Sequence, residues 1–253
     1  MSKNFSPSYP RPFYESGRLL KSGVRSRAIF LFVVVATACF SSSGHSRPLG
    51  LYGFLAVPSG EFGNTTDEKG GLAKMGFAIG SEVELLELPL AAPGLYWIAG
   101  AMVAFNSFDT DAMVDIMGGG SVDSGWWVNV PLLTGLRFEA RAGPKITLYS
   151  AGLAGVSFSR SPGFRWSGTV FDGMNYHDEI LTQESGVGSS FAFEVGSGLL
   201  IGDTFDVSLR YVNMGKPLFN IDTALTIDGY PQRGSDRFRQ SVSMFVASAG
   251  VRF

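Results

Sequence analysis

The stretch that decides the fold is residues 240–253, QSVSMFVASAGVRF. From Ser243 onward every second residue falls on one face, which carries Phe245, Val251 and Phe253 together with small residues. An alternation with period two predicts a β-strand. The ends of soluble domains are usually polar and poorly ordered, so a strand that finishes on phenylalanine needs a neighbour on each side. We therefore expect this strand to close a barrel.

The composition points to a non-aqueous exterior. The chain has 253 residues, enough for one large domain. Charged residues make up 17%, below the roughly 25% that is usual in soluble domains, and there are 33 glycines and 21 phenylalanines. A net charge of −2 provides no basic surface for nucleic acid, so we expect no nucleic-acid partner.

The N-terminal part of the sequence predicts export. Lys21, Arg25 and Arg27 precede an apolar run at residues 28–38, AIFLFVVVATA, which ends in an A-x-A site. A basic stretch, a short apolar core and small residues at a cleavage site are typical of a signal peptide. The run is shorter than the roughly 20 residues that a transmembrane helix needs. We therefore predict that residues 1–38 are a signal peptide with a long basic leader.

Cys39, the only cysteine, directly follows Ala38 at the expected cleavage site. A single cysteine cannot form a disulfide within the chain. Its position resembles a bacterial lipoprotein box, although Ala36 stands where such boxes usually carry leucine. We favour ordinary cleavage, with residues 39–48 as a short flexible segment, and keep lipidation of Cys39 as the alternative.

Eight alternating runs in the remaining chain predict the architecture. Their connections are alternately long and short; the last short one is the dipeptide Gly202-Asp203, and outer-membrane barrels combine short periplasmic turns with longer extracellular loops. We therefore predict an all-β, eight-stranded antiparallel up-and-down transmembrane β-barrel over residues 49–253, with no helix after the signal peptide. The predicted strands are 49–57, 72–86, 95–106, 125–139, 146–158, 190–201, 204–214 and 241–253, and the predicted extracellular loops are 58–71, 107–124, 159–189 and 215–240.

The two faces of each strand differ in a way that suggests which one is inside. Strand 204–214 places Val207 and Leu209 on one face and Asp206 and Arg210 on the other. The polar faces are rich in glycine, alanine and serine, which suits the narrow interior of eight strands. A soluble lipocalin-like carrier, which would bury the apolar face instead, stays an alternative. The strands at 49–57 and 146–158 have too few polar residues to be oriented.

The charges on the polar faces nearly balance. Buried charges need partners, and water-filled channels are found in barrels of about 16 or more strands. We therefore predict an interior network of ion pairs rather than an ion pathway. Its members are Lys74, Glu82, Glu84, Arg137, Glu139, Glu194, Asp206, Arg210 and Arg252.

The order of four motifs resembles a known family. The motifs are WWVNVPLLTGLRFE, ITLYSAGLAGVSF, FDVSLRYVNMG and the final GVRF. Together they resemble the eight-stranded outer-membrane β-barrel domain of the OmpX/OmpA-like superfamily. This resemblance implies residence in the bacterial outer membrane, contact with its lipid and lipopolysaccharide, and a final strand, with Val251 and Phe253, that the barrel-assembly machinery reads. Family members include adhesins, complement-resistance factors, structural anchors and enzymes, so the resemblance leaves the role open.

Two groups of polar residues are candidates for chemistry. Outer-membrane lipid-modifying enzymes resemble one another in using a histidine, and His177 lies beside Asp178, but the sequence places no nucleophile within reach. The acidic segment that starts at Asp109 has Val114 and Gly120 where a calcium loop needs glycine and glutamate. We therefore predict no catalytic residue, metal or cofactor.

The third long loop concentrates aromatic and basic side chains. Exposed aromatic residues with arginine are typical of interaction surfaces, although the same residues could fold over the barrel as a lid. We predict a non-enzymatic structural or adhesion-like protein, with an outer-leaflet lipid-modifying enzyme and a soluble periplasmic carrier as alternatives. The candidate surface-interaction residues are Phe164, Arg165, Trp166, Phe171 and Tyr176.

Overall fold

The computed structural model describes residues 49–66, 70–88 and 92–253. The predicted signal peptide, the cleavage or lipidation site at Ala38 and Cys39, and the segment 39–48 lie outside these residues. None of the helices within the described ranges is long and apolar enough to cross a membrane.

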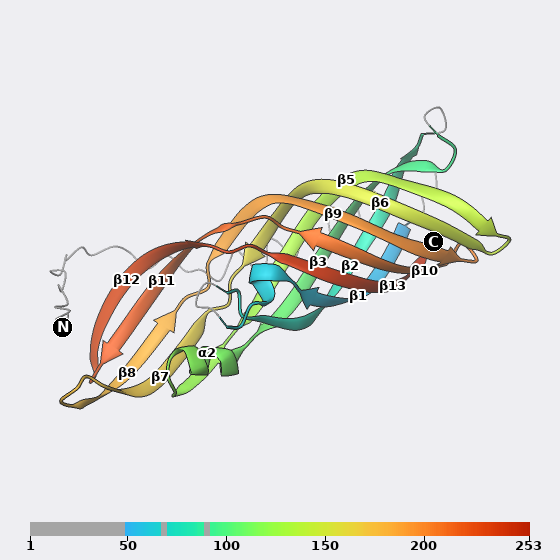
Figure 1. Ribbon diagram of the computed structural model, residues 1–253. Coiled ribbons are helices and arrows are strands. Elements are labelled where there is room, and N and C mark those ends of the chain that lie inside the picture. Colours follow the sequence, from blue (N-terminus) through green and yellow to red (C-terminus); the bar gives the residue numbers. More distant parts are fainter. Residues whose placement is uncertain (1–48, 67–69, 89–91) are drawn as a thin grey trace, which may run out of the picture. The chain divides into compact units, whose positions relative to one another are not determined.

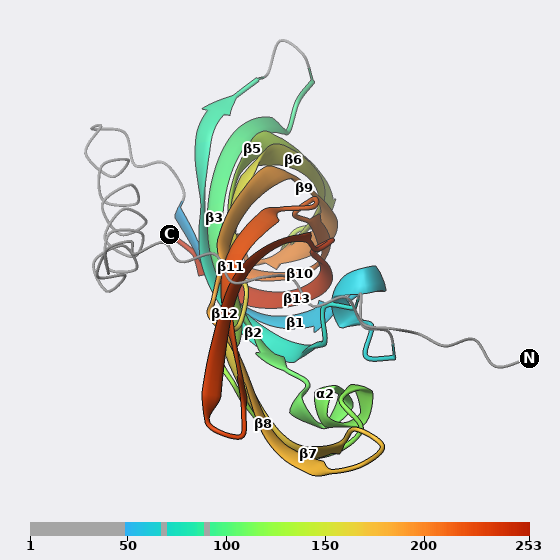
Figure 2. The same cartoon turned by 90° about the vertical axis from the view of Figure 1, so that its left-hand side faces the viewer.

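Eight antiparallel strands form a closed barrel, which confirms the predicted fold (Figures 1 and 2). The ring runs in the order β1-β13-β10-β9-β6-β5-β3-β2, so each strand pairs with its neighbour in sequence among the eight, and β13 closes on β1. The closure is continuous at its end, because the Leu49 and Phe253 backbones exchange hydrogen bonds of 3.2 and 3.0 Å. The strands are β1 (Leu49–Pro58), β2 (Ala73–Glu87), β3 (Leu95–Phe108), β5 (Trp126–Gly143), β6 (Ile146–Arg160), β9 (Val187–Ile201), β10 (Phe205–Asn213) and β13 (Ser243–Arg252).

The long connections are more ordered than the sequence predicted. Instead of four loops, they contain five further strands, which pair with one another in the order β12-β11-β8-β7-β4. We call this the loop sheet, and we call the barrel end that bears it the loop end (Figure 1). The expected absence of helices was also wrong, since α2 (Thr110–Ile116) and the 3-10 turn η2 (Gly60–Gly63) occur here. The sheet consists of β4 (Ser121–Ser124), β7 (Phe164–Phe171), β8 (Tyr176–Gln183), β11 (Leu218–Ile227) and β12 (Tyr230–Arg239).

The apolar face of the barrel points outward. Leu209, at the centre of β10, is 59% exposed, whereas its neighbour Arg210 is buried inside. The strands that the sequence could not orient follow the same rule: Tyr52 of β1 and Tyr149 of β6 are buried. Glycines make room for these rings, since a Cβ at Gly198 would lie 2.6 Å from the Tyr149 ring. The interior is therefore narrow and filled by a few large side chains.

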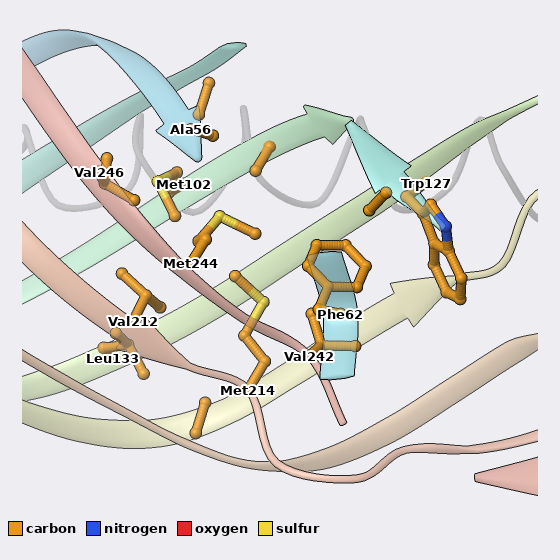
Figure 3. Packing of buried hydrophobic residues seen from close by; sticks show 14 of the residues in the cluster. Ala56, Phe62, Met102, Trp127, Leu133, Val212, Met214, Val242, Met244 and Val246 are labelled. Atoms are coloured by element: carbon orange, nitrogen blue, oxygen red, sulfur yellow. The ribbon is translucent and has the colours of Figure 1, made fainter. Parts of the chain in front are cut away.

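An apolar cluster fills the loop end of the interior (Figure 3). Phe62 of η2 is fully buried and meets the Trp127 ring edge-on, at 5.4 Å between centroids. Trp127 in turn packs on Phe219 of β11 at 5.7 Å, and its indole N–H donates to the Gly71 carbonyl at 2.9 Å. Met214 and Met244 belong to the same buried cluster (Figure 3). This cluster, which the sequence analysis missed, connects the barrel to the loop sheet.

Candidate functional site

A continuous network of ion pairs occupies the barrel interior. Arg137, which is 1% exposed, pairs with Glu82 and Glu84, and its Nε lies 2.9 Å from Glu139 Oε1. Arg252 lies 3.2 Å from Glu84 and 3.0 Å from Glu139. The guanidinium groups of Arg137 and Arg252 thus share the carboxylates of Glu84 and Glu139. These ion pairs fix the positions of the side chains and connect three strands of the ring, β2, β5 and β13.

Arg210 extends the network across the barrel. Its Nη1 lies 3.1 Å from Glu82 Oε2 and 3.0 Å from Glu194 Oε1. Its guanidinium also lies 5.1 Å from the centre of the Tyr52 ring, which adds a cation–π attraction. We call these side chains the lumen network: Glu82, Glu84, Arg137, Glu139, Glu194, Arg210 and Arg252.

Two predicted members of the interior network, Lys74 and Asp206, form no ion pair with the lumen network. Lys74 is at the loop end and pairs with Asp109 at 3.0 Å, outside the lumen network; the reason is a register shift between Ala73 and Gly76. Asp206 is buried in the interior but accepts a hydrogen bond from the Tyr149 hydroxyl at 2.7 Å rather than from an arginine. Period-two counting places a residue on a face, but it does not detect the bulge that displaced Lys74.

The lumen network is closely packed at the centre of the barrel and more open at the end with the short turns, where Glu84, Glu139 and Arg252 line a pocket of about 510 Å³. The cavity among Tyr52, Glu82, Glu194 and Arg210 measures about 20 Å³, which is room for about one water molecule. The centre of the interior is therefore a packed, charge-paired core.

The loop sheet separates the five candidate interaction residues into two groups. Trp166 is only 3% exposed, and its indole N–H donates to the Gly119 carbonyl at 2.8 Å. Phe164 stacks on Phe108 at 6.0 Å. These two aromatic side chains thus pack inside the molecule, Phe164 against the barrel strand β3 and Trp166 against the segment before β4.

The other three candidate residues remain accessible. Arg165 is exposed on β7, while Phe171 and Tyr176 contact each other at 4.9 Å and stand at the tip of the β7–β8 hairpin. Met174, in the turn between them, is 86% exposed. The tip therefore presents apolar side chains to its surroundings.

His177 ties two hairpin tips together. Its Nδ1 lies 2.6 Å from Asp228 Oδ2, in the β11–β12 turn, and its Nε2 lies 3.0 Å from Asp172 Oδ2. Hydrogen bonds to Asp228 and then Asp172 raise the pKa of His177. The backbone N–H groups of Asn175 and Met174, followed by His177, lower the pKa of Asp172 to about 2. Both ring nitrogens are thus occupied by carboxylates, as in a structural clamp.

The acidic segment has a structural use. The Asp109 side chain accepts the Ala112 N–H at 3.1 Å and so caps α2, which is a common role for aspartate. Within the described ranges, no group of three or more His, Cys, Asp or Glu side chains is arranged to hold a metal ion.

Comparisons with known proteins give fold similarities at low sequence identity. No protein-family model and no curated protein matches the chain. The attachment invasion locus protein Ail of Yersinia pestis is 15% identical, with 82% of this chain and 97% of that chain covered and a TM-score of 0.40. Neisserial surface protein A is 12% identical, with 82% and 96% covered and a TM-score of 0.41.

A third solved structure is a major outer membrane protein from Thermus thermophilus. It is 11% identical, with 83% of this chain and 100% of that chain covered and a TM-score of 0.42. The strand pairing itself gives the present chain a closed eight-stranded antiparallel barrel, and in this fold the chain is similar to Ail, to Neisserial surface protein A and to the Thermus protein.

Proposed function

We propose that the protein is an integral outer-membrane β-barrel with a non-enzymatic surface-interaction role. The observation that carries its location is the outward apolar face of a closed barrel, with Phe191, Leu209 and Phe245 all exposed. Soluble monomers rarely expose apolar patches beyond a few hundred Å². Strands of roughly 9–11 tilted residues span a bilayer, and β10 and β13 have 9 and 10.

Two alternatives have less support. A soluble carrier needs an enclosed cavity for its ligand, whereas the cavity at the centre of the lumen network measures about 20 Å³ and the pocket of about 510 Å³ beside Arg252 is open to the surroundings. In a lipid-modifying enzyme that uses a histidine, that side chain must exchange a proton, whereas both nitrogens of His177 are held by Asp172 and Asp228; the other histidine, His45, lies outside the described residues. These observations favour a barrel that anchors the loop sheet at the cell surface.

The feature of the loop sheet that suits binding is the free edge of β12. Among the described strands, none pairs with the outer edge of β12. Asp228 and Gly229 both have positive φ and join Ile227 to Tyr230, which is the geometry of a type I′ turn. In such a turn the N–H of the fourth residue points back at the first. The backbone of Tyr230 therefore faces β11.

Alternation along β12 then assigns every other backbone group to the free edge. The residues with odd numbers, from Pro231 to Arg239, direct their N–H and C=O groups outward. Two observations agree: Pro231 has no N–H to leave unpaired, and the Arg237 N–H donates to its neighbour Asp236 at 2.7 Å rather than to β11. This edge offers a partner strand a row of backbone donors and acceptors.

The same alternation places three arginines on one face of that edge. Arg233, Arg237 and Arg239 are exposed, and none forms an ion pair with another described residue. An extended protein segment with acidic residues at alternate positions would satisfy both the backbone and these charges. We infer that this is the class of extracellular ligand.

The test uses a fluorescent ten-residue peptide of alternating Glu and Thr, with the protein folded in detergent micelles. Anisotropy should show saturable binding that Arg233→Glu weakens about tenfold or more, since close charge pairs are worth more than ~1.4 kcal/mol. Asp236→Ala should strengthen binding, because it releases the Arg237 N–H.

Two controls separate strand addition from charge attraction alone. A peptide that is N-methylated at alternate residues keeps its charge but cannot pair, and should not bind. Arg141→Glu, at the opposite end of the barrel, should have no effect. Equal binding of the methylated peptide would contradict the proposed edge, while fractionation of the protein into the soluble periplasm would contradict the membrane location.

A further inference from the structure

The outward face of the barrel carries one charge. Across the regularly paired residues of the eight strands, Arg160 is the only charged side chain with an outward position. It pairs in register with Val128 and Val187, and it shares its face with Val156 and Phe158, both exposed. Arg160 ends β6 at the loop end. The guanidinium group of Arg160 therefore lies at the boundary between the apolar band of the barrel and the surrounding water.

Beside Arg160 lies a groove in the outer surface, with a volume of about 470 Å³. Its walls are aromatic, because Phe77 stacks on Phe105 at 5.2 Å and meets Trp126 edge-on at 6.2 Å. Gly125 and Gly163, which also line it, contribute no side chains. We call this the aromatic groove. An apolar slot on a lipid-facing surface has the shape and chemistry for an acyl chain.

Arg160 lacks a counter-charge. Its Nε and Nη2 donate to the Ser185 hydroxyl at 3.1 and 2.9 Å, and none of the described carboxylates lies within ion-pair distance of it. Arginine stays charged at every physiological pH, and its planar fork matches a phosphate. The other Nη2–H and the two Nη1–H donors can therefore meet an anion at the membrane boundary.

We propose that the aromatic groove and Arg160 bind one molecule of a phosphate-bearing lipid in the loop-side leaflet. An acyl chain fills the groove, and a phosphate group of the same molecule binds the Arg160 guanidinium. The proposal rests on the membrane location proposed above. In an outer membrane the lipid of this leaflet with that chemistry is lipid A, the phosphorylated anchor of lipopolysaccharide, and we commit to it as the occupant.

The experiment uses the full mature protein in phosphatidylcholine nanodiscs that contain increasing amounts of lipid A, with bound lipid counted by native mass spectrometry. One lipid A should be retained per protein. Arg160→Gln should weaken retention about tenfold, as expected for a lost hydrogen bond to a charged group. Arg141→Gln, an exposed arginine at the other end of the barrel, is the matched control and should bind as the unaltered protein does.

Dephosphorylated lipid A tests whether the phosphate and Arg160 act together. It should bind the unaltered protein about as weakly as intact lipid A binds Arg160→Gln, and combining the two changes should cost little more. Phe105→Ser should weaken both lipids, because it removes part of the chain-binding wall. Inorganic phosphate at millimolar concentration should not displace the lipid.

Three results would overturn the proposal: unchanged retention in Arg160→Gln, an equal loss in Arg141→Gln, or displacement by inorganic phosphate, which would indicate a site for the free anion. Insertion is monitored in the same samples by the heat-modifiable band on gels. A protein that inserts but retains no lipid A refutes only this site, whereas a protein that never inserts refutes the membrane location.

Discussion

The barrel and the loop sheet are both antiparallel β-structure, yet they treat their side chains in opposite ways. In the barrel, Leu209 faces outward and Arg210 is buried in the lumen network. In the loop sheet, Trp166 is buried and the arginines of β12 are exposed. The loop sheet thus follows the rule of a protein in water, and the barrel follows the rule of a protein in lipid.

The difference shows that backbone pairing does not decide what lies inside. Closure gives every barrel strand two neighbours, so its exterior can be apolar without leaving hydrogen bonds open to lipid. The loop sheet keeps two edges, at β12 and β4, and unpaired edges need water or a partner. The first region is therefore suited to anchoring and the second to recognition.

The largest expected effect is in the lumen network. Arg137→Leu leaves Glu82, Glu84 and Glu139 with fewer partners in a buried site, and breaking a buried ion pair typically costs about 3–5 kcal/mol. Equilibrium unfolding in guanidinium with lipid vesicles should show this loss. Arg233→Leu in β12 should change the free energy of unfolding by less than about 0.5 kcal/mol. If the two substitutions changed the free energy of unfolding by similar amounts, the proposed difference between the barrel interior and the loop sheet would be wrong.

The next effect tests the outward face directly. Leu209→Arg places a charge at the centre of β10, where a lipid-facing arginine costs about 2–4 kcal/mol near the midplane. Insertion into vesicles, followed by the heat-modifiable band, should fall accordingly. Tyr230→Arg in the exposed edge strand β12 serves as the control and should insert normally. Normal insertion of Leu209→Arg would mean that this face does not contact lipid.

A smaller effect is expected in the turn of the β11–β12 hairpin. Gly229 has a φ of 86°, and a Cβ there would meet no atom within 4 Å. Gly229→Ala is therefore expected to cost only the backbone strain of the left-handed region, about 1–2 kcal/mol. Amide hydrogen exchange should speed up in β11 and β12 and stay unchanged in β13. Faster exchange throughout the barrel would show that the two regions unfold together.

The smallest effect concerns pH at the His177 clamp. Because its pKa is raised in the folded protein, the clamp is complete below the unfolded pKa of about 6.5 and is lost as the pH rises through the folded value. Asp172, with a pKa of about 2, stays ionised over this range, and the pKa of Asp228 is also lowered, first by its bond to His177.

Asp178, the other carboxylate beside the clamp, donates its backbone N–H to Asp228 at 3.1 Å, and its side chain accepts from the Thr169 hydroxyl at 3.0 Å. Hydrogen exchange at residues 172–178 should increase between pH 6 and pH 9 beyond its intrinsic rate. His177→Asn should remove that excess. An excess that persists in the variant would assign it to another group.

Much of the barrel could be predicted from sequence, because lipid outside and side chains inside impose strict alternation. Each of the eight strands lies within a few residues of its predicted range, and the closing strand was recognised from its last residues. The interior position of Arg137 and Arg210 followed from alternation together with the small residues that share their faces, which suit a narrow interior. Their pairing did not, since it depends on which carboxylate is opposite them around the ring.

The loop sheet was harder to predict for two physical reasons. Its strands mix threonine, aspartate and arginine on faces that are both partly wet, so the alternation is weak. The indole N–H of the buried Trp166 donates to the carbonyl of Gly119, which is 47 residues away in sequence, and no local pattern indicates such a contact. One signal was present and overlooked: Asp228-Gly229 between alternating residues is a strong indication of a type I′ hairpin.

The most direct test of the central claim, that lipid surrounds the barrel and side chains fill it, is spin-label accessibility along β10 in lipid vesicles. Labels are placed singly at positions 206, 207, 208 and 209. The account predicts that labels at 207 and 209 collide with oxygen dissolved in the bilayer and are shielded from a water-soluble nickel chelate, whereas those at 206 and 208 are shielded from both. Labels at 207 and 209 that the nickel chelate reaches freely would contradict it.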